Sequence, residues 1–150
     1  MKLTRLEEQG MRLTMCLARR GGQMNLQDFA SQEGISEALA AKVLGKLRHG
    51  GIVSVLRGRK GGYELAQDAN SLTVSDVLKS LGRPLIEGCF TEDNGCLHAD
   101  DCGIRPIWQY LSFKIAEVLE QITLSDLIKD EPMVRSQIDE IAENTHGADK

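Results

Sequence analysis

The 150-residue sequence predicts a mainly α-helical fold with one small β-hairpin. Apolar residues recur at helical spacing in several segments, and glycines or N-capping residues separate those segments. One β-rich run, at 52–57, precedes a glycine-rich turn and a second short run. No apolar run approaches the ~18 residues that a membrane span requires, so we expect no membrane contact.

Three helices are expected before the hairpin, over residues 5–20, 25–34 and 36–50. The last two are joined by a tight turn after Gly34, and the third has an apolar stripe opposite a face of small and basic residues. Such a pair matches a helix-turn-helix, whose second helix lies in the major groove of DNA. From this helix we expect DNA contacts by Ser36, Ala38 and Lys42.

The segment after the third helix predicts a hairpin with a cationic tip. Its strands are expected at 52–57 and 63–66, and the turn between them is rich in glycine. Glycines let backbone amides approach phosphates, and long arginine side chains reach into a narrow minor groove. A hairpin at this place completes a winged helix-turn-helix, and its expected DNA contacts are Arg57, Arg59 and Lys60.

Charge is divided unevenly along the chain. Residues 1–65 carry 11 Lys or Arg and 6 Asp or Glu, a net charge of +5, whereas residues 66–150 carry 7 and 16, a net charge of -9. The basic part suits a polyanionic partner, and we expect that partner to be double-stranded DNA. The sequence contains no phosphate-binding loop and no nucleophile–base arrangement, so we do not expect an enzyme.

A long helix with a heptad seam is predicted after residue 103. Its apolar residues follow one another at spacings of 4, 3, 4, 3 and 4, which is typical of a helix that packs on a partner helix. We therefore expect a homodimer, which places two winged helices on a palindromic operator. The expected dimer contacts are Ile104, Trp108, Leu111, Ile115, Val118 and Ile122.

The expected organisation has four parts. Residues 1–82 form the DNA-binding domain, and a helix capped by Thr73 ends it. An acidic loop, 83–103, separates it from the dimerisation and C-terminal helices at 104–142, in which Pro132 is expected to interrupt the chain. Residues 143–150 are expected to be a disordered tail.

Three cysteines, Cys89, Cys96 and Cys102, lie in or at the end of the acidic loop, whereas Cys16 is expected in the core of the first helix. The N-terminus lacks the apolar stretch of a signal peptide, so we expect a cytoplasmic protein with reduced thiols. Three nearby thiols at this spacing favour an iron–sulfur cluster, and zinc, thiol redox chemistry and inert thiols are the alternatives that the residues alone leave open.

Several motifs together resemble the Rrf-two family of bacterial transcription regulators. They are the start Met1–Thr4, the hairpin sequence 55–63, the three-cysteine loop and the segment Ile122–Leu127, so the resemblance covers residues 1 to about 130. It implies a homodimeric winged-helix regulator that senses redox, nitric oxide or iron status through a cluster held by the loop cysteines. The alternatives are a thiol- or zinc-based regulator on the same frame and, in a different class, an iron–sulfur enzyme or electron carrier.

The resemblance also bears on the fourth cluster ligand. Some members have a histidine three residues after the last cysteine, where this chain has Arg105, which cannot ligate iron. Others use an N-terminal carboxylate of the other subunit, at a position that matches Glu8. The resemblance therefore favours Glu8 as ligand and a 4Fe-4S cluster over 2Fe-2S, with Glu7, His98 or water as alternatives. A base-reading glutamate of some members is replaced here by Ala41.

Overall fold

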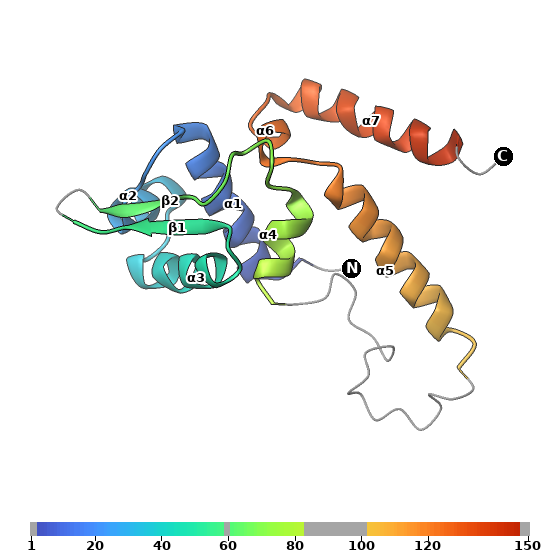
Figure 1. Ribbon diagram of the computed structural model, residues 1–150, viewed down its shortest axis with the longest axis horizontal. Helices are drawn as coiled ribbons and strands as arrows, with labels where there is room; N and C mark the ends of the chain where they lie inside the picture. Colours follow the sequence, from blue (N-terminus) through green and yellow to red (C-terminus); the bar gives the residue numbers. More distant parts are fainter. Residues whose placement is uncertain (1–2, 59–60, 83–101, 148–150) are drawn as a thin grey trace.

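The computed structural model describes residues 3–58, 61–82 and 102–147. In these residues, five of the helices and a hairpin form a body, and the other two helices extend away from it (Figure 1). The predicted mainly α-helical winged helix-turn-helix is confirmed. The elements are α1 (Arg5–Arg20), α2 (Leu26–Glu33), α3 (Glu37–His49), β1 (Val53–Leu56), β2 (Gly62–Leu65), α4 (Val74–Ser80), α5 (Arg105–Glu120), α6 (Leu124–Leu127) and α7 (Glu131–Gly147).

The first four helices start and end where the sequence predicts, whereas the short α6 was not predicted. At the start of α2, the side chain of Asn25 accepts a hydrogen bond from the Asp28 amide at 2.9 Å, and Ser36 does the same for the Leu39 amide of α3 at 3.2 Å. Gly34 ends α2 with a φ of 63°, a left-handed conformation that favours glycine. This glycine reverses the chain between α2 and α3.

One apolar core fixes the position of α3. Its inner stripe packs against α1 and α2, while its outer face is left to solvent. Burial of these side chains holds the helix rigidly, because a well-packed core tolerates little displacement. The completely buried members of this core include Leu13, Phe29, Ala40, Val43, Leu44 and Leu47.

The hairpin is attached to the body through the segment that precedes α2. β1 and β2 are antiparallel, with Val53 opposite Leu65. The backbones of Met24 and Tyr63 exchange two hydrogen bonds of 2.8 Å. Gly62 permits this approach, because a Cβ there would lie 2.6 Å from the Met24 carbonyl oxygen. The end of β2 next to the turn is therefore held close to the start of α2.

The segment after α5 pairs with the segment before α4. Val74 N donates to Ile122 O at 2.9 Å, and Leu124 N donates to Leu72 O at 2.8 Å. This pairing corrects one prediction: α5 ends at Glu120, so Ile122 lies beyond the helix and is buried in the core of its own chain. Extended backbone pairing replaces helical hydrogen bonds here, and the predicted seam ends at Val118.

The C-terminal segment is more helical than predicted. Pro132 lies in the first turn of α7, where backbone amides have no hydrogen-bond partner within the helix. It therefore starts the helix rather than interrupting it. Asp130 accepts a hydrogen bond from the Met133 amide at 3.1 Å and supports this start. The helix continues to Gly147, past the expected start of a disordered tail at residue 143. Across the described ranges, no helix combines the length and apolar character needed to cross a bilayer.

Candidate nucleic-acid interface and cysteine region

The outer face of α3 is small at its centre and basic around it. Ser36, Ala38 and Lys42 are all exposed, as the predicted DNA contacts must be. A Cβ added to Gly45 would meet nothing within 4 Å, so this part of the helix faces open space. A helix with such short side chains can enter a groove and bring its backbone close to the bases.

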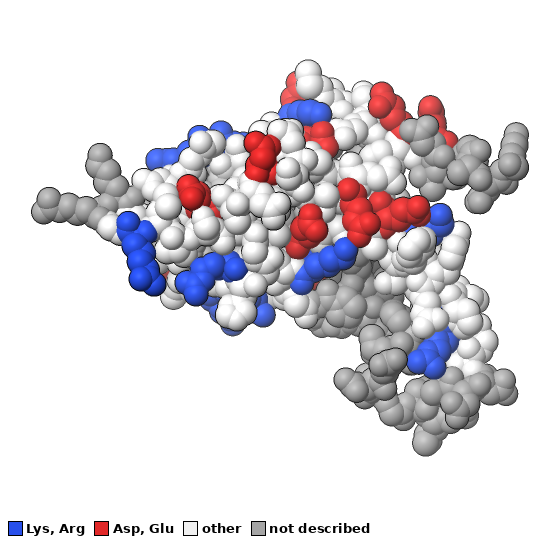
Figure 2. Space-filling model, viewed as in Figure 1, with Lys and Arg blue, Asp and Glu red and all other residues white. Residues whose placement is uncertain are grey.

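Basic side chains continue from α3 to the hairpin. Lys46 and Arg48 lie in the last turn of α3, and Arg57 follows β1; all three are exposed. In the view of Figure 2, Lys and Arg gather over α3 and the turn end of the hairpin, whereas Asp and Glu concentrate towards α4, α6 and α7. Two predicted hairpin contacts, Arg59 and Lys60, lie outside the described residues.

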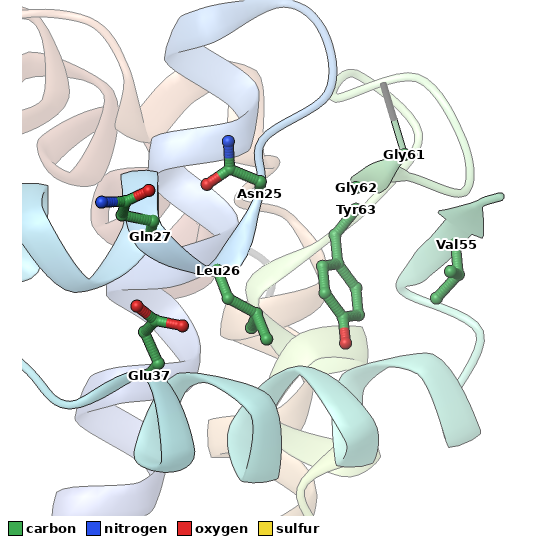
Figure 3. Close-up of a pocket in the computed structure, with 8 residues that line it drawn as sticks. All are labelled: Asn25, Leu26, Gln27, Glu37, Val55, Gly61, Gly62 and Tyr63. Carbon is green, nitrogen blue, oxygen red and sulfur yellow. The ribbon is translucent and has the colours of Figure 1, made fainter. Parts of the chain in front are cut away.

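A groove of about 390 Å³ separates the start of α2, the start of α3 and the hairpin (Figure 3). The side chains of Gln27 and Glu37 face the same space from two helices, and the ring of Tyr63 closes another side. The sequence prediction missed this groove, since no periodic pattern links residues so far apart in the chain. Its lining residues are Asn25, Leu26, Gln27, Glu37, Val55, Gly61, Gly62 and Tyr63.

A polar bridge joins α1 to the end of α2. The Glu33 carboxylate accepts hydrogen bonds from Arg12 Nε at 2.5 Å and from Cys16 Sγ at 2.7 Å. Burial first, and then the hydrogen bond to Glu33, raise the pKa of Cys16 to about 12. Partial burial alone would raise the pKa of Glu33, but hydrogen bonds from Cys16 and Arg12 outweigh it and lower this pKa. Cys16 is therefore a neutral thiol at physiological pH, buried as predicted.

The candidate cluster ligands come from separate regions. Cys102 is half-buried, is not in a disulfide and lies just before α5; Cys89, Cys96 and His98 lie outside the described residues. Glu8 is exposed on α1, 3.8 Å from Arg12, and Figure 1 places α1 away from the start of α5. Within the described part of the chain, no three His, Cys, Asp or Glu side chains are grouped to hold a metal.

Glu7, the alternative carboxylate, is already engaged. It is buried, and its Oε2 accepts a hydrogen bond from the Thr4 amide at 2.6 Å in a capping box. Recruiting Glu7 to a metal would break this cap, whereas Glu8 is exposed and, among the described residues, contacts only Arg12, at 3.8 Å. Of the two N-terminal carboxylates, Glu8 is the one that can be used without disturbing α1.

No residue of α5 is buried, although the helix is rich in large apolar side chains. Ile104, Trp108 and Leu111 of the predicted seam are 49%, 38% and 39% exposed, and Ile115 and Val118 are half-buried. Three further exposed residues, Ile107, Tyr110 and Phe113, fall outside the heptad pattern and were missed for that reason.

The comparisons with known proteins agree with this architecture. The model of the Rrf2 family, described as an iron-dependent transcriptional regulator, matches residues 3–130. The transcriptional regulator IscR of Escherichia coli, described as helix-turn-helix type, is 30% identical over 122 residues, which cover 81% of this chain and 75% of that protein.

Solved structures are similar over most of the chain. IscR of T. potens has a TM-score of 0.69 at 28% identity and covers 87% of this chain and 88% of its own. CymR, the global cysteine regulator of Bacillus subtilis, has a TM-score of 0.70 at 25% identity and covers 87% and 99%. With a family match over most of its length and a winged helix that presents a basic face, the chain belongs to the Rrf2 family of transcriptional regulators.

Proposed function

We propose that this regulator is a homodimer whose two winged helices bind a palindromic duplex and whose affinity depends on an iron–sulfur cluster held by the loop cysteines. The observation that carries the DNA-binding part is the outer face of α3, which is free of large side chains at its centre and basic at its margins. The adjoining hairpin adds the exposed cation Arg57, directly after β1.

The dimer is supported by α5. A monomer rarely exposes so many large apolar side chains on one helix, because their contact with water is unfavourable. A second copy of α5 is the natural cover, since the seam from Ile104 to Val118 keeps the spacing of a two-helix coil. Two-fold pairing of this helix would set two copies of α3 for successive turns of a duplex.

The donor set fits an iron–sulfur cluster. Thiolates are its usual protein ligands, and Cys89, Cys96 and Cys102 supply three of them. Glu8 supplies an exposed carboxylate on α1, and the separation of α1 from the start of α5 within one chain favours a Glu8 that comes from the second copy. When bound, the cluster supplies a centre that reacts with oxidants or nitric oxide, and a 4Fe-4S type suits this set of donors.

The first experiment tests DNA binding. A duplex library randomised over about 30 base pairs is enriched on the purified protein, and the affinity of the selected duplex is measured against salt. Lys42→Ala should weaken binding and flatten the slope of log K against log salt by about 0.9. Arg135→Ala, a change of an exposed arginine on α7, is the control and should leave both unchanged. No enrichment of any duplex would overturn the proposal.

The second experiment tests the cluster. Protein purified without oxygen is analysed for its visible spectrum and for iron, sulfide and zinc. About four irons and four sulfides per chain support a 4Fe-4S cluster, and Cys102→Ala should lose them while Cys16→Ser keeps them. Zinc, or no metal after reconstitution, would leave the regulator but replace the cluster by the zinc- or thiol-based alternative.

A further inference from the structure

Two consecutive aliphatic side chains are exposed at the turn end of the hairpin. Val55 is 40% exposed and Leu56 is 39% exposed. Within residues 3–58 and 61–82, the one other large apolar side chain that is exposed is Leu3, near the start of the chain. Exposed apolar residues that are scattered singly need no explanation, but this pair adjoins the proposed DNA contacts. We therefore asked what surface would cover it.

The pair makes the turn end of the hairpin apolar on both of its faces. Successive side chains of a strand point to opposite faces, so Val55 and Leu56 lie on different faces of the two-stranded sheet. Val55 is opposite Tyr63 and lines the groove of Figure 3. Leu56 is opposite Gly62, which has no side chain to cover it. The backbone pair of Met24 and Tyr63 fixes this end of the hairpin on the body.

The charge around the pair favours a polyanionic partner. Arg57 follows Leu56 directly and is exposed, and the sequence from 55 to 63 contains no Asp or Glu. The nearest carboxylate along the hairpin, that of Glu64, lies farther from the turn, opposite Ser54, whose Oγ donates a hydrogen bond to it at 3.2 Å. A partner that covers the pair must therefore combine apolar surface with negative charge. Duplex DNA does so, because its deoxyribose rings line the grooves between the phosphates.

The place of the hairpin beside α3 selects the part of the duplex. With α3 in the major groove, as proposed, the hairpin beside it reaches the neighbouring minor groove. We infer that Val55 and Leu56 pack against the deoxyribose walls of that minor groove. Such contacts release water but no counterions, so this part of the affinity does not depend on salt. They leave the base edges unread, so they do not change the preferred sequence.

This inference rests on the proposed binding of a duplex, and its test uses the duplex that wild-type protein selects. Val55→Thr replaces a methyl group by a hydroxyl, and Leu56→Thr likewise removes apolar surface; threonine is common in strands. Each change should weaken binding roughly 3- to 10-fold and leave the slope of log K against log salt unchanged. Arg57→Ala should also weaken binding, but it should flatten that slope by about 0.9.

Two variants serve as controls. Leu56→Met keeps an apolar side chain of similar volume and should bind the duplex like wild-type protein. Ile138→Thr makes the same kind of change at a 47% exposed aliphatic residue of α7 and should also bind like wild-type protein. Thermal unfolding followed by circular dichroism should show nearly the same transition for every variant, because exposed positions contribute little to packing.

The contrary results are distinct. If wild-type protein selects no duplex, the proposed function fails and the inference fails with it. If wild-type protein selects a duplex but both threonine variants bind it equally tightly, the inference alone is wrong. It is also wrong if Leu56→Met loses as much affinity as Leu56→Thr, or if Leu56→Thr selects a different sequence from the library. A changed oligomeric state of the threonine variants in sedimentation experiments would assign the pair to a protein interface instead.

Discussion

Large apolar side chains are buried in the body but exposed on α5. In the body, Phe29, Leu44 and Leu47 are completely buried within one chain. In α5, no residue is buried, and Phe113 is 62% exposed. The body therefore has the contacts that a stable fold needs, whereas α5 has the composition of an interface without its partner. The difference separates residues that fold the monomer from residues that we propose assemble the dimer.

The largest expected effect tests the body with a matched pair of phenylalanines. Phe29→Ala should lower the free energy of unfolding by about 3–5 kcal/mol, because it leaves a cavity in a packed core. Phe113→Ala should change it by less than about 0.5 kcal/mol, because that ring is exposed and lies outside the proposed seam, so its removal breaks few contacts. Urea unfolding followed by circular dichroism measures both. Similar losses for the two variants would erase the proposed distinction between the regions.

The second expected effect tests α5. Leu111→Glu places a charge in the proposed seam and should yield a monomer in sedimentation experiments. A monomer cannot bind both half-sites of a palindromic duplex at once, so the affinity for that duplex should fall roughly 100-fold or more. Gln109→Glu, on another side of α5, is the control and should remain dimeric. A dimeric Leu111→Glu would show that the two copies meet elsewhere.

The third effect concerns the junction between the two regions. Burial alone would raise the pKa of Asp126, but hydrogen bonds from Lys129, Thr123 and Gln137 hold it well below its usual range. Asp126→Asn should therefore lower the free energy of unfolding by about 1.5 kcal/mol at pH 7. Because the folded pKa is depressed, this contribution is present above pH 3.8 and is lost as the pH falls further.

Thermal unfolding of wild-type protein and Asp126→Asn at pH 7 and at successively lower pH measures this difference. Asp139→Asn, at an exposed position of α7, is the control and should unfold like wild-type protein at each pH. A constant gap between Asp126→Asn and wild-type protein down to pH 2 would contradict the assignment of the stabilising charge to Asp126.

The smallest effect tests the thiol of the body. The raised pKa of Cys16 means that the folded state favours the neutral thiol, so its stabilising effect is complete below pH 9 and decreases as the pH rises towards 12. At pH 10, wild-type protein should have lost about 1 kcal/mol relative to Cys16→Ser. Chemical denaturation at pH 8 and pH 10 measures the loss, and a gap between the two proteins that does not change with pH would show that this thiol does not titrate in the fold.

Local signals explain why much of the fold was predictable. The cap Ser36 and the reversal at Gly34 act within one turn of the chain, so the bounds of α3 follow from the sequence. The exposure of Lys42 follows as well, because a helical period that buries Leu44 and Leu47 leaves the other face outside.

Contacts between distant segments were not predictable in this way. Ile122 kept the heptad spacing, but pairing of its backbone with Val74 removed it from α5. Glu33 of α2 bonds to Arg12 and Cys16 of α1. No pattern in the sequence predicts that these residues meet. Cys89 and Cys96 remain sequence predictions, since they lie outside the described residues.

The sequence by itself determined the helices, the hairpin, the basic outer face of α3 and the family, because caps, periodicity and motifs are properties of neighbouring residues. The tertiary structure decided which apolar residues are buried in the core and which stay exposed on α5, and it brought Glu37, Gln27 and Tyr63 around one groove. The physical reason is that burial and the meeting of side chains depend on how helices pack in space, which local spacing does not specify.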